Sequence, residues 1–487
     1  MGAEIKKKKQ TMMCAEELKF NNVRNKKLNS QATRKTRGIT LIALVVTIVV
    51  LLILAGITIS LVFSENGIIA KAKEAAEKTN QAAINEQAQM NELAGYLDNM
   101  LNEIGENGEE PNPPEPTLPS DGSYSEEKGV NTPNLGEGMT AIKWDETKND
   151  WVETNGSDKD WYDYTSKKWA NAKTSDGSMW VWIPRYAYSI TSGYHQSGAQ
   201  INPTTPAEGA GNIEVEFMKG LTNETSTGRT SFQNSSGQGK WNIHPAFSYG
   251  QTVSGIWVAK FEASNSGGKI KVEPGVQSWR SITVNDIYTN CLNYNKTLNS
   301  HMMKNDEWGA VAYLSKSKYG KNAEVTINDS SSYYTGGGSG NAYVTNVGQS
   351  TTGTVHGVYD MSGGAWEYVA AYVNNGNSNL TSYGSSLVNG DAKTKNVYSK
   401  GSSDSRDNNY SANSGKYGDA VYETSANGNS SNGSWYGDYS YFPYTDWPFF
   451  KRGGDYDNGT TAGVFYFHSD GGHSYRYTSF RPVLVAL

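Results

Sequence analysis

Hydrophobic positions along the chain first mark out one continuous apolar stretch. From Gly38 to Phe63 the sequence GITLIALVVTIVVLLILAGITISLVF contains no charged residue, and about twenty apolar residues suffice to cross the hydrocarbon core of a bilayer. Between residues 67 and 104 strong helix formers such as Ala, Glu, Gln and Leu predominate, with Ile68, Ala72 and Ala75 at helical spacing. The pattern predicts one membrane and stalk helix over residues 39–104.

The rest of the chain follows a different pattern. Residues 105–137 are dense in Pro, Gly and acidic residues, which predicts a semi-extended linker. Residues 138–487 contain all 13 Trp. Aromatic and β-branched runs at 176–190 and 255–264 predict strands, and 298–320 predicts a helix with Trp308 and Val311 near one face. We therefore expect an α+β fold, in which a long N-terminal transmembrane and stalk helix precedes an irregular head.

Charge is divided unevenly between these parts. Residues 1–38 contain 11 Lys and Arg against 3 Asp and Glu, a net charge of +8, whereas the remaining chain carries −14. Basic residues beside an apolar segment mark its cytoplasmic side. The pattern predicts a single-pass membrane protein with a basic cytoplasmic leader, residues 1–38, and an extracellular head. Such a basic run is also typical of nucleic-acid tails, but its position directly before the apolar segment makes the membrane the expected partner and not nucleic acid.

The junction TRKTRGITLIALVVTIVV resembles the prepilin cleavage motif of type IV pilins and pseudopilins. In that family a peptidase cuts after the Gly, so the resemblance implies cleavage between Gly38 and Ile39. It also implies a prepilin peptidase and other pilin subunits as partners, and assembly into a surface pilus. The chain departs from the family at Ala43, where a Glu is usual. A plain single-pass anchor is the alternative.

Four separated motifs in the head resemble a second family. KNDEWGAVAYL, VYDMSGGAWEYV, RGGDY and SFRPVL, within residues 180–487, are similar to signatures of formylglycine-generating-enzyme-like domains, which have the C-type lectin fold. Enzymes of that family oxidise a substrate cysteine with two cysteines that hold copper. This head has only Cys291, in a stretch typical of a buried helix, and the other cysteine, Cys14, precedes the apolar segment. We therefore expect no such oxidase activity.

Other catalytic patterns are weak. The six histidines show no HExxH spacing, and no Gly-rich phosphate loop follows a strand. The pairs Asp306–Glu307 and Asp360–Glu367 have the residue types of a glycosidase, but the family motifs assign them to core and turn. No cofactor is expected; acidic loops such as SSDSRDNNY leave calcium open.

The window 455–478 has an unusual composition. Its 24 residues include no Lys, Glu, Gln, Met or Trp, the five amino acids that no codon ending in cytosine encodes. This exclusion resembles the variable regions of diversity-generating-retroelement proteins, which end a C-type lectin-fold domain. The resemblance implies a fixed framework consisting of Gly453, Gly454, Gly463, Phe465, Phe467, Phe480 and Arg481.

The same window suits a binding surface. Tyr gives a large, rigid contact, and Ser, Gly and Asn give adaptable hydrogen bonds, as in antibody paratopes. Alternation in VFYFH predicts that Phe465 and Phe467 face inward and that Val464, Tyr466 and His468 share the other face. The residues expected to face a ligand are Tyr456, Tyr466, His468, Ser469, Asp470, His473, Ser474, Tyr475, Arg476 and Tyr477. The alternative is that Tyr475 and Tyr477 are ordinary surface aromatics.

Together these patterns predict a surface-displayed, pilin-like adhesin or receptor-binding protein of a Gram-positive-type cell. Its C-type lectin-fold head is expected to bind an extracellular protein, a glycan or a phage through a diversified surface. Two alternatives stay open. One is a surface enzyme of the formylglycine-generating type, and the other is a passive structural subunit of a pilus or cell wall.

Overall fold

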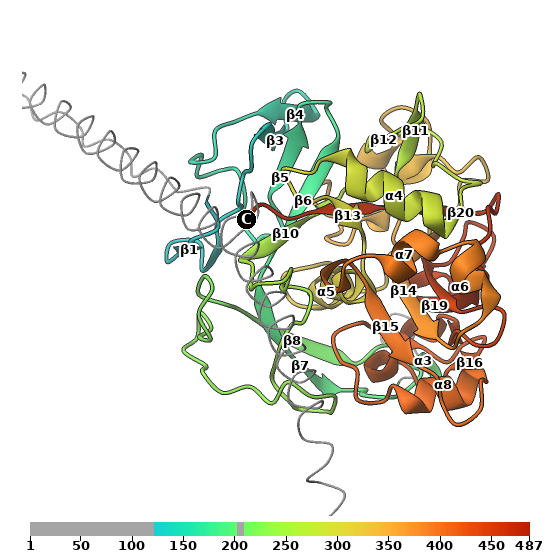
Figure 1. Ribbon diagram of the computed structural model, residues 1–487. Coiled ribbons are helices and arrows are strands. Elements are labelled where there is room, and N and C mark those ends of the chain that lie inside the picture. Colours follow the sequence, from blue (N-terminus) through green and yellow to red (C-terminus); the bar gives the residue numbers. More distant parts are fainter. Residues whose placement is uncertain (1–120, 202–208) are drawn as a thin grey trace, which may run out of the picture. The chain divides into compact units, whose positions relative to one another are not determined.

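A seven-stranded sheet occupies one side of the computed structural model (Figure 1). The structure describes residues 121–201 and 209–487. In spatial order the strands are β13 (His301–Met302), β21 (Pro482–Leu484), β10 (Gly255–Ala259), β6 (Met179–Pro184), β5 (Asn171–Thr174), β3 (Met139–Asp145) and β4 (Asp150–Glu153). The sequence of β6, MWVWIP, is buried at every position, because both faces of this central strand are covered.

A second seven-stranded sheet carries the C-terminal part of the chain. Its strands are β15 (Asn396–Ser399), β14 (Trp366–Asn374), β18 (Phe449–Gly453), β19 (Gly463–Asp470), β17 (Ser440–Tyr441) and β16 (Asn429–Ser430), with β20 (Thr478–Phe480) beside β14. β14 pairs in parallel with β15 and β20 and antiparallel with β18. The sheet is therefore mixed, and β14, β18 and β19 form its centre.

Smaller elements complete the fold. A three-stranded sheet has the order β8 (Asn212–Phe217), β7 (Tyr186–Ser192) and β9 (Asn242–Ile243), and two hairpins pair β1 (Tyr124–Ser125) with β2 (Val130–Asn131) and β11 (Ser264–Ser266) with β12 (Lys269–Lys271). The helices are α3 (Gly198–Ile201), α4 (Val284–Tyr294), α5 (Asn305–Lys316), α6 (Ser378–Ser382), α7 (Ser385–Asn389) and α8 (Arg406–Ala412). Single 3-10 turns are η2 (Thr335–Gly337), η3 (Ala342–Val344), η4 (Val347–Gln349), η5 (Ala392–Thr394), η6 (Tyr422–Thr424), η7 (Trp435–Gly437) and η8 (Gly459–Thr461).

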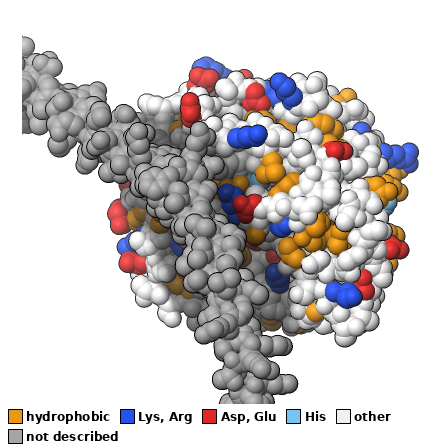
Figure 2. Space-filling model, viewed as in Figure 1, with side chains coloured by type: hydrophobic (Ala, Val, Ile, Leu, Met, Phe, Trp, Pro, Cys, Tyr) orange, Lys and Arg blue, Asp and Glu red, His pale blue; other side chains and the backbone are white. Residues whose placement is uncertain are grey.

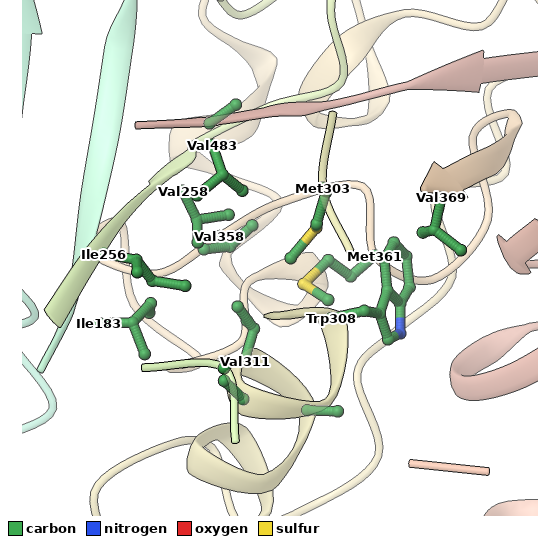
Figure 3. Packing of buried hydrophobic residues seen from close by; sticks show 14 of the residues in the cluster. Ile183, Ile256, Val258, Met303, Trp308, Val311, Val358, Met361, Val369 and Val483 are labelled. Atoms are coloured by element: carbon green, nitrogen blue, oxygen red, sulfur yellow. The ribbon is translucent and has the colours of Figure 1, made fainter. Parts of the chain in front are cut away.

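The hydrophobic core lies around α5, of which every residue is buried. Figure 3 shows Ile183 and Val258 of the first sheet facing Val311 of α5, with Val369 of the second sheet on the other side of Trp308. The indole Nε1 of Trp308 donates to a main-chain carbonyl of β19 at 2.8 Å. The helix thus packs against both sheets and fixes their separation.

The expected α+β class is wrong. In the part of the chain that the structure describes, sheets predominate and the helices are short, and α5, with 12 residues, is the longest. The same residues include no helix with the length and apolar character that a bilayer crossing requires. The physical reason is composition: the head is rich in Gly, Asn, Ser and aromatic residues, which favour loops and strands over long helices. The expected membrane and stalk helix, residues 39–104, lies outside the described residues.

Element boundaries differ from the sequence expectation in several places. The run 176–190 contains β6 and β7, as the aromatic pattern predicts. The segment expected to be helical over 298–320 instead holds β13 and then the shorter α5. β1 and β2 fall within the expected linker 105–137, and the described residues from Asp121 onward belong to the same compact unit as the head. The leader, residues 1–38, lies outside the described residues.

A buried ion pair joins the two large sheets. Arg481 stands between β20 and β21, and its Nε donates to the Glu367 carboxylate of β14 at 2.8 Å. Its Nη1 and Nη2 donate to the carbonyls of Ala259 and Tyr359 at 2.9 and 3.0 Å. Both charged side chains are almost inaccessible, at 0% and 1% exposed. The guanidinium thereby connects β10, β14 and the last strands of the chain.

Removing this arginine should cost far more stability than removing an exposed one. In Arg481→Ala the Glu367 carboxylate is left buried without its partner, and we expect a loss of about 3–5 kcal/mol in the free energy of unfolding. Urea denaturation of the full-length chain measures the loss. The matched control is Arg229→Ala, because Arg229 pairs with Glu216 at 2.9 Å where the side chains are 33% and 14% exposed. Its loss should be about 1 kcal/mol or less. Equal losses in the two variants would contradict the role assigned to Arg481.

Candidate ligand-binding surface

The window 455–478 crosses the second sheet and then leaves it. After η8 it forms β19, which pairs with β18 on one side and β17 on the other. Residues 471–477 then form a loop, called here the tyrosine loop, before β20 begins. In Figure 1 β20 and β1 lie at opposite sides of the molecule. The loop is therefore remote from the first described residues.

Burial on β19 corrects the predicted outward set. Phe465 is buried against Trp435, as expected for the inward face, with ring centroids 5.0 Å apart. Tyr466, however, is also buried, 1% exposed, and stacks on Tyr439. Ser469 is buried as well. The expectation that Tyr466 and Ser469 point outward is wrong, because β19 is an internal strand that is covered on both faces.

The end of β19 forms a polar boundary between sheet and surface. His468 and Asp470 are half-buried. Burial, with a further contribution from Lys451, lowers the pKa of His468 to about 3, so the imidazole is neutral at physiological pH. Nζ of Lys451 pairs with the Asp470 carboxylate at 3.3 Å, and Tyr368 donates its hydroxyl to the same group. These two predicted residues therefore serve partly as structural contacts.

The tyrosine loop contains a run of four consecutive exposed residues. His473, Ser474, Tyr475 and Arg476 are all exposed, and Tyr475 has 48% of its surface accessible. Tyr477 is half-buried beside Tyr475, with ring centroids 5.7 Å apart. The structure thus brings five of the ten predicted ligand-facing residues together in one short segment.

Main-chain carbonyls attach this loop to the domain. Each of three successive carbonyls accepts a hydrogen bond from a residue far away in the sequence. The pairs are Ser281 N to Tyr475 O at 3.0 Å, Arg280 Nη1 to Arg476 O at 2.6 Å, and Trp366 N to Tyr477 O at 2.9 Å. A further bond runs from Val284 N to Gly472 O at 3.1 Å. Since a carbonyl is present whatever the side chain, the loop's conformation depends little on which residues occupy it.

Aromatic rings behind the loop form a rigid support, called here the aromatic cluster: Tyr333, Trp366, Tyr456 and Tyr477. Tyr456 packs edge-on against Tyr333 at 5.0 Å, and Trp366 packs edge-on against Tyr477 at 6.1 Å. Three of these rings each have a cation over one face: Arg280 over Tyr333 at 3.9 Å, Lys451 over Trp366 at 3.5 Å and Arg476 over Tyr477 at 4.5 Å. Such contacts stabilise each ring by about 0.5–2 kcal/mol. The predicted residue Tyr456 is half-buried here.

A shallow hollow adjoins the loop. Its volume is about 470 Å³, and its lining residues are Asn265, Gln277, Ser278, Trp279, Arg280 and Ser281. Sequence reasoning missed Arg280, because the residue lies 196 positions before its partner Arg476. It also missed Tyr333, which has only local turn residues around it. At 277–281 the feature of the sequence that could have indicated a binding surface is a Trp beside an Arg among polar residues.

Charge on the visible surface is dispersed. On the face that Figure 2 shows, Lys and Arg side chains stand singly among neutral ones, and acidic side chains are scattered between them. Long-range attraction to a polyanion needs a continuous block of positive charge. The distribution on this face favours recognition through shape and hydrogen bonds.

The groups considered for catalysis lie inside the protein. Glu307 is 1% exposed; burial alone would raise its pKa, but Lys304 and His301 lower it to about 2. Asp360 and Glu367 are each 1% exposed. Cys291 is fully buried on α4, as the sequence predicts, and burial raises the pKa of its thiol well above the usual range. A substrate has no access to these side chains in this conformation.

Residues 121–201 and 209–487 contain no group of three or more His, Cys, Asp or Glu side chains placed to hold a metal ion. The predicted cleavage residues Gly38 and Ile39 lie outside these ranges. In comparisons with known proteins, the chain matches no family model and no curated protein.

Two tyrosines of the window should differ sharply in their effect on stability. Tyr466→Ala removes a buried ring and leaves a cavity, and we expect a loss of about 3–5 kcal/mol in the free energy of unfolding. Tyr475→Ala removes a ring that is about half exposed and should change the free energy by about 0.5 kcal/mol or less. Urea denaturation of the full-length variants measures both. A similar loss in both would mean that the loop side chains are part of the fold.

Proposed function

We propose that this protein is a binding protein, an adhesin or receptor-binding molecule, which meets a macromolecular ligand through the tyrosine loop and the aromatic cluster. The observation that carries the proposal is the way the loop is attached. Its backbone is bound by fixed donors, while its side chains from His473 to Arg476 are exposed to solvent. A loop of this kind tolerates sequence change without loss of the fold, which is what a diversified recognition surface requires.

The chemistry of the loop agrees with this role. Tyr and Arg are enriched in the residues that contribute most to protein interfaces, and the loop presents Tyr475, Arg476 and Tyr477 side by side. The aromatic cluster limits the motion of Tyr477, so little conformational entropy is lost when a ligand binds. The absence of Lys, Glu, Gln, Met and Trp from the window 455–478 is a separate argument, from the sequence, for diversification.

The family resemblances form part of the same proposal. KNDEWGAVAYL supplies most of α5, and VYDMSGGAWEYV leads into β14. RGGDY begins in the last two residues of β18, and SFRPVL includes most of β20 and all of β21. Residues of these motifs meet in the core, where Arg481 of SFRPVL binds Glu367 of VYDMSGGAWEYV. This convergence supports the resemblance to retroelement-diversified proteins of the formylglycine-generating-enzyme-like group.

The two alternatives make different demands on the molecule. An oxidase of the related type needs an accessible pair of thiols, and the one thiol of the head, Cys291, is buried. A passive structural subunit needs no exposed segment with a separately anchored backbone. Surface display belongs to the proposal too, and it rests on the sequence of residues 1–63, which lie outside the described residues.

Randomising the loop tests the proposal directly. In the full-length chain, His473, Ser474, Tyr475, Arg476 and Tyr477 are replaced by a library of codons ending in cytosine. We expect most members to melt within about 4 °C of the parent, because the anchoring carbonyls remain. We also expect selection against a panel of immobilised proteins to yield binders. Thermal melting and enrichment measured by sequencing provide the two readouts.

The control library randomises the buried neighbours Tyr466, Phe467 and Ser469 in the same way. Most of its members should fail to fold, because both faces of β19 are packed. If the loop library unfolds to the same extent, or if it yields no binder to any protein in the panel, the proposed role of the loop is wrong.

Calcium, which the sequence left open at SSDSRDNNY, is tested separately. In the structure the two carboxylate oxygens of Asp404 accept hydrogen bonds from the side-chain amides of Asn409 and Asn375 at 2.8 and 2.9 Å. A calcium ion would have to compete with both amides for these oxygens. We expect the melting temperature of the full-length chain to be the same in millimolar calcium and in excess EGTA. A rise in the melting temperature with calcium would show that the loop rearranges to bind the ion.

A further inference from the structure

A second group of aromatic residues, two half-buried and one exposed, surrounds a half-buried arginine. The guanidinium carbon of Arg406 lies 4.6 Å from the ring centre of Tyr441, 4.4 Å from that of Tyr444 and 5.8 Å from that of Trp447. Trp447 has 44% of its surface exposed, and its ring packs edge-on against Tyr444 at 5.8 Å. We call these four residues the Arg406 patch. All four lie outside the window 455–478, and of the four only Arg406 belongs to a segment considered for function from the sequence, the acidic loop SSDSRDNNY.

Arg406 is short of hydrogen-bond partners. Within the described residues its one hydrogen bond runs from Nη1 to Asn429 Oδ1 at 3.4 Å, and it forms no ion pair. Its Nε is buried and has no acceptor among residues 121–201 and 209–487. An arginine has five N–H donors, so this guanidinium keeps most of its hydrogen-bonding capacity unused while rings hold it in place.

Acidic residues near the patch form no ion pair with Arg406 within the described residues. Asp404 accepts from two asparagine amides, and Asp446 accepts from Asn377 Nδ2 at 2.8 Å. Asp407, in the first turn of α8, is exposed. His468, which packs edge-on against Tyr441 at 5.0 Å, is neutral because burial lowers its pKa to about 3. In the part of the chain that the structure describes, no carboxylate is therefore bound to the guanidinium of Arg406.

The patch is linked to the tyrosine loop by residues in contact. From Tyr441 the contacts run to His468, which lies opposite Lys451 in the β18–β19 pairing. Lys451 lies over Trp366, and Trp366 packs against Tyr477. The patch and the loop are thus joined through His468, Lys451 and Trp366.

We propose that the Arg406 patch binds a carboxylate on an acidic segment of a protein ligand, with the apolar neighbour of that carboxylate packed on Trp447. The guanidinium offers paired donors that match the geometry of a carboxylate. Trp, Tyr and Arg are the residue types that dominate binding energy at protein interfaces, which favours a protein over other carboxylate sources. The inference rests on the proposed binding role of the head, and it adds a fixed contact beside the variable loop.

An array of immobilised decapeptides tests the inference with the purified full-length chain. Each peptide carries one Glu or Asp next to Leu or Tyr, and its twin carries Gln or Asn instead. We expect the acidic peptides to retain at least about ten times more protein than their amide twins, and we expect Arg406→Gln to remove that preference. Trp447→Ala should weaken retention of the acidic peptides, and raising the salt concentration should weaken it as well.

Arg229→Gln is the matched control, because Arg229 also lies over an indole, that of Trp241 at 3.9 Å, but is already paired with Glu216. It should retain the preference for acidic peptides. An unchanged preference in Arg406→Gln, measured on protein with the parental melting temperature, would overturn the inference. Retention on immobilised polygalacturonate but on no peptide would overturn the assignment to a protein ligand. Tyr475→Ala should leave the preference for acidic peptides intact. The experiment therefore distinguishes a wrong assignment of the Arg406 patch from a wrong assignment of the tyrosine loop.

Discussion

The position of every surface feature depends on the buried contact between Arg481 and Glu367. This one guanidinium binds a carboxylate of the second sheet and a carbonyl of β10 in the first sheet. Because Arg481 directly follows β20, the contact also fixes the strand that ends the tyrosine loop. Two more carboxyl groups, Glu262 and Asp360, are buried nearby, and burial raises the pKa of Glu262 well above its usual range. Burial also raises the pKa of Glu367, to about 7, although Arg481 opposes this shift.

Because the loop is attached through its carbonyls, its side chains can change without loss of the contacts that hold its backbone. Stability depends on which side chains fill the core, whereas recognition by a variable surface requires that side chains change. Here the donors are Ser281, Arg280 and Trp366, which lie on other segments, and the acceptors are backbone atoms of the loop. The energetic cost of a substitution at Tyr475 is thus limited to its own contact with Tyr477. A scaffold that positions variable loops in this way is a common arrangement in binding proteins.

How far the sequence predicts this structure depends on whether the deciding contacts are local. The aromatic runs of β6 and β7 and the buried position of Cys291 are predictable, because they follow from composition over a few residues. The burial of Tyr466 is not predictable in this way. Period-two alternation assumes that one face of a strand is solvated, and both faces of β19 are covered. The α+β class failed because the helical pattern lies before residue 105, whereas the described residues form sheets. Arg280 and Tyr333 had no local signal, because their roles arise only when distant segments meet.

The combination of a changeable loop and a fixed arginine has a consequence for specificity. If residues 473–477 alone supplied affinity, each new loop sequence would have to create a complete interface, and most would bind nothing. Arg406, Tyr441, Tyr444 and Trp447 lie outside the window 455–478, so under the proposed diversification they would stay constant while the loop changes. In that proposal a constant contact with a carboxylate would supply a base level of affinity for many protein surfaces, because acidic side chains are common on them. The loop then has only to discriminate among ligands that are already weakly held, and specificity is a difference between affinities.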